Sequence, residues 1–156
     1  FMPTSSGRNR YNVLGAIHAV THHLITLCNE TYVNANVICE LLLEIRKTHR
    51  GEIPVTLVMD NAKYQRCSVV MESAEKLKIE LLFLPAYSPN LNLIERLWKW
   101  VKKDCLYCRY YESFSNFKKA IDETLQKVTL QESKKELNSL LTLKFQSFNN
   151  VIYSRV

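Results

Sequence analysis

The sequence predicts a single α/β domain, and three observations carry this prediction. The chain has 156 residues, of which 47% are hydrophobic and 23% charged, an ordinary globular composition for one domain. It contains only 3 glycines and 4 prolines, so most of it should be helix and strand joined by short connections. Helical patterns alternate with short apolar runs over residues 37–84, which is typical of parallel strands linked by helices.

The first elements are a β-hairpin and a helix. Residues 12–20 and 23–28 are two short apolar segments separated by a polar turn, and two such strands in succession predict an antiparallel hairpin. Apolar residues then recur with the 3.6-residue period of a helix, and either Asn34 or Asn36 provides a side chain that caps its first turn.

Two further strands occupy the middle of the chain. Residues 53–59 are almost continuously apolar, the pattern of a strand buried on both faces, and the run ends abruptly at Asp60. A helix capped by Ser68 follows, and residues 80–84 form another short strand before a proline. The order helix, strand, helix, strand predicts that the two strands are parallel.

The remaining chain has helical patterns, over residues 93–107, 114–128 and 136–148. No apolar run approaches the ~18 residues that cross a bilayer. The five cysteines are scattered through apolar segments and suit a reducing compartment better than a disulfide framework. We expect a cytoplasmic protein with no membrane partner.

The basic residues are concentrated in one segment. The net charge is +6 and the pI is near 9.1. Residues 96–119 contain seven basic and two acidic side chains, interleaved with seven aromatic ones. Either a solvated helix face above core aromatics or a nucleic-acid surface explains such a segment. The charge therefore favours a polyanionic partner and leaves both explanations open.

Two acidic residues, Asp60 and Glu95, are expected near the carboxyl edge of the parallel strands, where functional groups of such sheets usually lie. Asp60 ends a buried strand, and ligands of α/β sheets bind at the carboxyl edge of the strands. Glu95 lies three residues after Asn92, on the first turn of the next helix and beside its buried stripe. Each acid has a structural alternative, because Asp60 can open an Asx-turn and Glu95 can close a capping box with Asn92. Together, the two carboxylates can hold a divalent cation.

Three stretches of the sequence resemble one family. Residues 59–62, Met-Asp-Asn-Ala, and residues 84–98, Leu-Pro-Ala-Tyr-Ser-Pro-Asn-Leu-Asn-Leu-Ile-Glu-Arg-Leu-Trp, are similar to the second and third catalytic blocks of the DDE transposases of mariner-like bacterial insertion sequences. The 34 residues 61–94 separate the two acids, and this spacing is that of the same branch. Residues 7–16 resemble the segment that these enzymes carry on their second strand.

The resemblance implies a DDE superfamily endonuclease domain with an RNase H-like fold, a mixed sheet flanked by helices. In that family three carboxylates bind two Mg²⁺ or Mn²⁺ ions, which activate water and then a DNA 3′-hydroxyl for in-line attack on phosphodiesters. Asp60 and Glu95 match two of these carboxylates, so both are expected to be catalytic metal ligands. Hard oxygen ligands and paired cations suit this chemistry, metal-dependent cleavage and strand transfer of an insertion sequence.

The chain departs from the family in its catalytic set. The family's first aspartate lies on a strand upstream of the segment that matches here from Gly7, and residues 1–6 contain no acid. Asp104 and Asp122 follow Glu95 on predicted helices, so neither can take the place of the aspartate on the missing first strand. The resemblance therefore implies an incomplete set of carboxylates.

The expected domain organisation follows from the same gap. We expect a single, partial RNase H-like domain over residues 1–156, the carboxyl-terminal fragment of a transposase. It lacks the first strand, which is central in such sheets, and carries residues 113–156 as a helical extension.

Two functions from different classes fit these expectations. The first is a transposase catalytic domain, and the alternative is a catalytically inactive transposase remnant that binds DNA non-specifically. A small-molecule α/β enzyme is disfavoured because the sequence has no Gly-rich phosphate loop. DNA is the expected partner, with a homodimer or a complementing amino-terminal transposase segment as further partners. The residues expected to contact DNA are Lys63, Arg66, Tyr87, Arg96, Lys99, Lys102 and Lys103.

Overall fold

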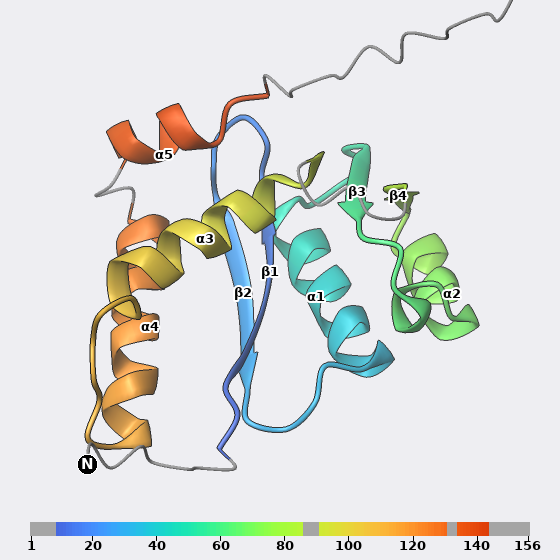
Figure 1. Cartoon of the computed structure of the whole chain (residues 1–156). Coiled ribbons are helices and arrows are strands. Elements are labelled where there is room, and N and C mark those ends of the chain that lie inside the picture. The colour runs from blue at the N-terminus through green and yellow to red at the C-terminus, as the bar shows by residue number, and fades with distance from the viewer. Residues whose placement is uncertain (1–8, 86–90, 131–133, 144–156) are drawn as a thin grey trace, which may run out of the picture.

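The computed structural model describes residues 9–85, 91–130 and 134–143, which form an α/β arrangement (Figure 1). Its elements are β1 Asn12–Ile17, β2 Leu24–Asn29, α1 Ala35–Thr48, β3 Val55–Met59, the 3-10 turn η1 Lys63–Gln65, α2 Ser68–Lys76, β4 Ile79–Phe83, α3 Leu93–Cys105, α4 Phe114–Thr129 and α5 Lys134–Leu140. This order confirms the predicted succession of helices and strands. Residues 144–148 of the last predicted helix lie outside the described residues. No helix in the described part of the chain is long and apolar enough to span a bilayer.

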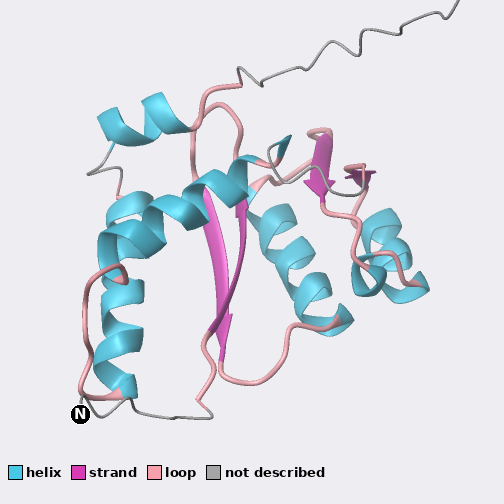
Figure 2. Cartoon of the chain, in the orientation of Figure 1, coloured by secondary structure: helices cyan, strands magenta, loops and turns pink. Residues whose placement is uncertain are grey.

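The β1–β2 hairpin is the middle layer of the structure, with helices on both of its faces (Figure 2). Its strands are antiparallel, and Ile17 lies opposite Leu24. Val13 and Ile17 contact one hydrophobic cluster. Leu14 and Ala16, which alternate with them along the strand, contact the other cluster. Both faces of the hairpin are therefore used for packing.

The first hydrophobic cluster joins one face of the hairpin to α3, α4 and α5. Its buried members are Leu24, Leu97, Val101, Cys105, Ile121, Leu125, Val128, Leu137 and Leu141. Tyr11, just before β1, donates its hydroxyl to the Asp122 carboxylate on α4. Burial, together with this hydrogen bond, raises the pKa of the Tyr11 hydroxyl. The first strand and α4 are thus joined by apolar packing and by a polar contact.

The second cluster joins the other face of the hairpin to α1, α2 and the β3–β4 pair. β3 and β4 are parallel, as predicted, with Val55 opposite Ile79. The expectation that the strand within residues 53–59, which is β3, is buried on both faces is wrong. Met59 is buried, but the neighbouring Val58 is 42% exposed. The reason is that α1 and α2 cover one face of the pair, and no described helix covers the other.

The four strands form two separate two-stranded sheets, β1–β2 and β3–β4. One pair is antiparallel and the other parallel, so the two kinds of pairing of a mixed sheet are both present. Among the described strands, none hydrogen-bonds to both pairs.

The ends of several elements are set by single side chains. β1 ends at Ile17 instead of residue 20, because the ring of His18 accepts two backbone hydrogen bonds within the turn, each 3.1 Å long. Asn34 caps α1, one of the two predicted choices. The predicted cap at Ser68 is wrong by one residue, because Cys67 occupies the N-cap position and Ser68 is the first residue of α2.

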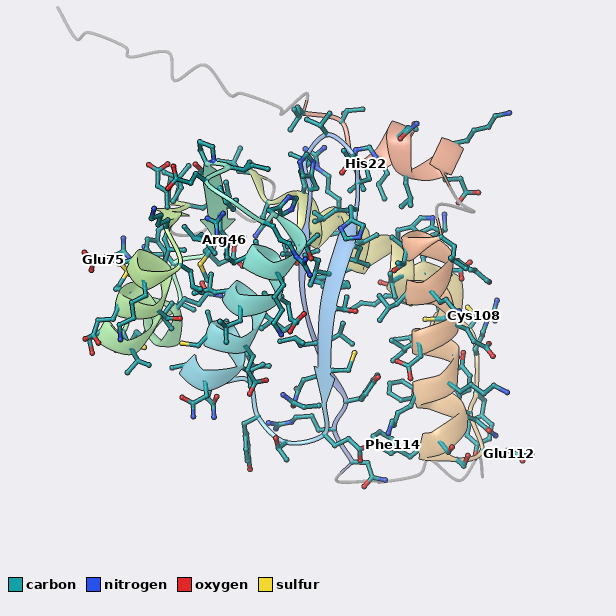
Figure 3. The ribbon with its side chains drawn as sticks, turned by 180° about the vertical axis from the view of Figure 1, so that it is seen from behind. His22, Arg46, Glu75, Cys108, Glu112 and Phe114 are labelled. Carbon is teal, nitrogen blue, oxygen red and sulfur yellow. The ribbon has the colours of Figure 1, made fainter. Side chains whose placement is uncertain are left out.

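Arg46 holds the connections that lead into β3 and β4 (labelled in Figure 3). Its half-buried guanidinium donates to the carbonyl oxygens of Leu77 and Lys78, both at 2.7 Å, in the turn before β4. It also donates to the carbonyl oxygens of His49 at 3.2 Å and Ile53 at 3.1 Å, between α1 and β3. One charged side chain therefore fixes the starts of both parallel strands relative to α1.

We predict that Arg46→Met lowers the free energy of unfolding by about 1–2 kcal/mol, because four partly exposed carbonyl oxygens lose a charged donor that water replaces only in part. Lys47→Met is the matched control, since the Lys47 side chain is 66% exposed and pairs with Glu44 on the surface, a contact worth at most ~0.5 kcal/mol. Urea denaturation of both variants provides the measurement. Equal midpoints for the two variants would show that Arg46 does not fix these connections.

Candidate active site

Asp60 is placed by the end of β3. It follows Met59 directly and is half-buried. Its Oδ1 accepts a hydrogen bond of 2.9 Å from the side-chain amide of Asn92. This bond connects the carboxyl end of β3 with the start of α3.

Asn92 is the N-cap of α3 and is only 8% exposed. Its side-chain oxygen accepts from the backbone N–H of Ile94 at 3.3 Å, which satisfies one free donor of the first helical turn. The nitrogen of the same amide donates to Asp60. One buried side chain therefore both begins the helix and orients the carboxylate at the end of the strand.

Glu95 lies on the first turn of α3, as predicted, and is half-buried. Among the residues that the structure describes, its carboxylate has neither a hydrogen bond nor an ion pair. The reciprocal capping bond to the backbone N–H of Asn92 is therefore not formed within this part of the chain.

The position of α3 depends on a close approach between Trp98 and β1. A Cβ atom at Gly15 would lie 3.0 Å from two atoms of the Trp98 ring and 3.3 Å from the carbonyl oxygen of Ile25. No side chain therefore fits at Gly15 without displacing the ring. Leu97, the neighbour of Trp98, is fully buried in the first cluster. These contacts hold the Glu95 helix against the hairpin.

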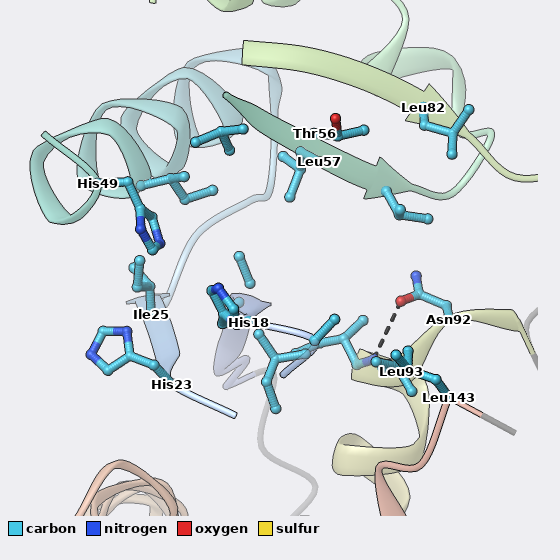
Figure 4. Close-up of a pocket in the computed structure, with 18 of the residues that line it drawn as sticks. His18, His23, Ile25, His49, Thr56, Leu57, Leu82, Asn92, Leu93 and Leu143 are labelled. Carbon is cyan, nitrogen blue, oxygen red and sulfur yellow. Dashed lines mark hydrogen bonds between the residues drawn. The ribbon is translucent and has the colours of Figure 1, made fainter. Parts of the chain in front are cut away.

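A cavity of about 680 Å³ lies next to these residues, between the hairpin and the β3–β4 pair (Figure 4). It is lined by the consecutive residues 15–17 of β1 and the consecutive residues 55–58 of β3. Because side chains alternate along a strand, consecutive lining residues mean that both strands present an edge to the cavity. Asn92 lies at one end of the cavity and His49 at the other. We call this cavity the groove.

The carboxylates of Asp60 and Glu95 are the type of ligand that a hard cation prefers, but two carboxylates are too few for a complete site. Carboxylate oxygens are the ligands that Mg²⁺ and Mn²⁺ prefer. Within the described ranges, no group of three or more His, Cys, Asp or Glu side chains is arranged to hold a metal ion. Asp60 and Glu95 therefore remain two candidate donors, with no third acid, His or Cys grouped with them in the described part of the chain.

The other two aspartates considered from the sequence belong to the packing between helices. Asp104 accepts from the Thr124 hydroxyl at 3.1 Å and lies 4.0 Å from the Lys127 ammonium. Asp122 accepts from Tyr11. Both are engaged between α3, α4 and the hairpin, and neither forms a metal-binding group with Asp60 or Glu95 in the described structure.

The basic residues of α3 fall into two kinds. Lys99, Lys102 and Lys103 are exposed, and no described acid pairs with them. Arg96 is half-buried and donates to the carbonyl oxygen of Thr142 at 3.0 Å. Arg96 thus ties α3 to the chain after α5, and the three lysines form the exposed basic surface of this helix.

Two of the remaining residues predicted to contact DNA, Lys63 and Arg66, lie at η1 and directly after it. Lys63 and Arg66 are exposed, and the Arg66 guanidinium stacks 4.7 Å from the centre of the Phe83 ring. They follow Asp60 along the chain, on the connection to α2. Tyr87 lies outside the described residues.

The arrangement of elements is that of an RNase H-like fold. It is similar to the catalytic domain of Mos1 mariner transposase, with a TM-score of 0.51 and 18% identity, over 88% of this chain and 82% of that one. The Mos1 transposase catalytic domain solved with raltegravir and Mn gives a TM-score of 0.54 and 17% identity, over 87% and 83% of the two chains. At these identities the likeness shows the fold.

Sequence comparison assigns the family. Residues 2–118 match the family model of the DDE superfamily endonucleases, and the chain belongs to this family. A curated relative, the insertion element IS630 uncharacterized 39 kDa protein of Shigella sonnei, is 28% identical over 97 residues. The match covers 62% of this chain and spans 28% of the relative's length.

Two residues that build this site are not identified by the sequence pattern. The pattern shows Asn92 only as a helix cap, because its bond to Asp60 joins residues 32 positions apart. Gly15 carries a local signal, since a glycine inside a strand often marks a close approach, but nothing local shows that Trp98 is the neighbour.

We predict that Gly15→Ala lowers the free energy of unfolding by about 1–3 kcal/mol, because the added methyl group overlaps the Trp98 ring. The same substitution in a Trp98→Leu background should cost at least ~1 kcal/mol less, since the smaller side chain leaves room. A double-mutant cycle by urea denaturation measures the coupling. Additive costs would show that this contact does not hold α3 against β1.

Proposed function

We propose that this chain provides the catalytic domain of an insertion-sequence transposase, with Asp60 and Glu95 as two of its catalytic carboxylates. The observation that carries the proposal is the 2.9 Å hydrogen bond from Asn92 to Asp60, which brings the end of β3 to the first turn of the Glu95 helix. Family membership and the Mos1-like fold support it. The substrate is DNA, and the reaction is phosphodiester cleavage followed by strand transfer.

Mg²⁺ or Mn²⁺ is the cofactor that the donor set suits, in a two-metal site. When bound, such ions supply activation of the attacking oxygen and stabilisation of the leaving oxygen. Asp60 would hold the cation with a carboxylate that Asn92 orients, and Glu95 would hold it from the helix turn. The Mos1 catalytic domain has been solved with Mn and with Mg, which supports this choice of cofactor.

A third carboxylate is needed to complete the proposed site. The family resemblance puts the missing aspartate on a strand at the centre of the sheet, and we place that strand in the groove between β1 and β3. A complementing amino-terminal transposase segment is the proposed source, and a homodimer is a separate proposed partner. In this proposal residues 1–156 are one partial domain, and residues 113–156 are its helical extension.

The DNA surface is proposed to follow α3 from the candidate active site. Lys99, Lys102 and Lys103 are exposed on the helix that begins with the Glu95 turn. Lys63 and Arg66 add positive charge on the connection after Asp60. These exposed cations, on the segments that follow each acid along the chain, would neutralise DNA phosphates without reading the sequence.

A second candidate function is that of a catalytically inactive remnant that binds DNA non-specifically. One observation favours it, namely that no third metal ligand joins Asp60 and Glu95 among the described residues. The two candidates share the DNA surface and differ in chemistry, so a cleavage assay separates them.

We predict salt-dependent, sequence-independent binding of duplex DNA through α3. Replacing Lys99, Lys102 and Lys103 with glutamine should flatten the slope of log K against log salt by up to ~3, since each lost phosphate contact removes about 0.9. Fluorescence anisotropy with unrelated duplexes at several salt concentrations measures this slope. The control with the same charge change replaces Lys47 on α1, Lys76 at the end of α2 and Lys78 just after α2. Equal slopes for the two triple variants would make the α3 lysines only a solvated face.

We predict that the chain alone nicks supercoiled plasmid little or not at all with Mg²⁺ or Mn²⁺, because two carboxylates hold cations weakly and out of place. Fusion of a strand that carries an aspartate should raise both the unfolding temperature and the nicking rate, since the strand fills the groove. Asp60→Asn or Glu95→Gln in the fused chain should return nicking to background.

Glu52→Gln is the control for this assay, because the Glu52 side chain is 89% exposed and precedes β3, whereas Asp60 follows the opposite end of that strand. It should leave nicking unchanged. Strong metal-dependent nicking by the unfused chain would refute the need for a third carboxylate. Nicking that survives both acid substitutions would remove Asp60 and Glu95 from the active site.

A further inference from the structure

We propose that Asn92 is a positioning residue whose single amide sets the Asp60 carboxylate relative to the Glu95 turn, an inference that rests on the proposed function. Its oxygen accepts from the backbone N–H of Ile94 at 3.3 Å, and its nitrogen donates to Asp60 Oδ1 at 2.9 Å. The side chain is almost fully buried, so it has little freedom to leave this arrangement. Capping alone would require only the oxygen.

The chemistry of the amide explains why asparagine stands here. An amide offers an acceptor and a donor on one short, planar group, and the acceptor is fixed because only the oxygen can accept from Ile94 N–H. The nitrogen must then face Asp60. Aspartate or serine caps a helix about as well as asparagine, but an ionised aspartate has no donor and a serine hydroxyl is too short to span both contacts.

The two groups that Asn92 connects are each held by a different core. β3 packs in the second cluster and is fixed at its start by Arg46. α3 packs in the first cluster and rests with Trp98 on Gly15. Relative movement of the two cores would separate Asp60 from Glu95, and the Asn92 amide opposes this movement at the site itself. Partners of this kind orient metal-binding carboxylates in many proteins.

The test compares Mn²⁺ binding with stability in the intact chain. Mn²⁺ binding is followed through paramagnetic broadening of amide NMR signals around Asp60, and stability through urea denaturation. Asn92→Ser keeps a capping oxygen and should weaken Mn²⁺ binding ~10-fold or more at a nearly unchanged urea midpoint. Asn92→Ala removes both roles and should lower binding and midpoint together. Wild-type Mn²⁺ binding by Asn92→Ser would reduce Asn92 to a helix cap. A midpoint loss as large as that of Asn92→Ala would overturn the positioning role, because the weaker binding would then follow from lost stability.

A second measurement separates this inference from the proposed function. Asp60→Asn tests the function, because it should abolish the Mn²⁺ broadening, and unchanged broadening would refute the metal site. The side-chain NH₂ signals of Asn92 test the contact without any metal. They should shift in Asp60→Ala and stay in place in the control Glu80→Ala, on the exposed face of β4. Signals that do not move in Asp60→Ala would overturn the positioning role.

Discussion

Both hydrophobic cores of this chain are built on opposite faces of one β-hairpin, and this constraint decides where the other elements lie. Successive residues of β1 serve different cores, with Val13 and Ile17 on one side and Leu14 and Ala16 on the other. A shift of one residue in the hairpin register would exchange the two sets. The helices α3 and α4 on one face, and α1 on the other, are therefore placed by the same six-residue strand.

The candidate active site lies where these two cores meet at the edge of the hairpin. Asp60 directly follows β3, which packs in the second cluster, whereas Glu95 lies on the first turn of α3, which packs in the first cluster. Neither core alone contains both acids. The geometry of the pair therefore depends on the thickness of the hairpin layer, on the Gly15–Trp98 contact that holds α3 close to it, and on the hydrogen bond between Asn92 and Asp60.

Periodicity and capping patterns predict most of the elements, because these features are local. The helix stripes, the cap at Asn34 and the parallel pairing of β3 with β4 are all visible in the sequence and present in the structure. The exposure of Val58 is not visible in the sequence, because an apolar run shows that a strand can be buried but does not show whether one or both of its faces are covered. The Asn92–Asp60 bond and the contacts of Arg46 with Leu77 and Lys78 also escape prediction, since each joins segments that are distant in the sequence. The metal-binding role of Asp60 and Glu95 stays a prediction.

The groove, where we place the proposed additional strand, adjoins the candidate acids, so the proposed sheet and the proposed site depend on the same element. The turn after β1 lies beside the connection into β3, with the ring centres of His18 and His49 5.7 Å apart, so the two strands run in opposite directions along the groove. A strand that pairs with β3 in the parallel sense would therefore pair with β1 in the antiparallel sense, as a mixed sheet requires. Its carboxyl end would lie at the same edge as Asp60. In the proposed function, one added strand would then satisfy a row of backbone groups on β1 and another on β3 and bring its last side chains to the candidate acids. A single element would thereby complete both the proposed sheet and the proposed site.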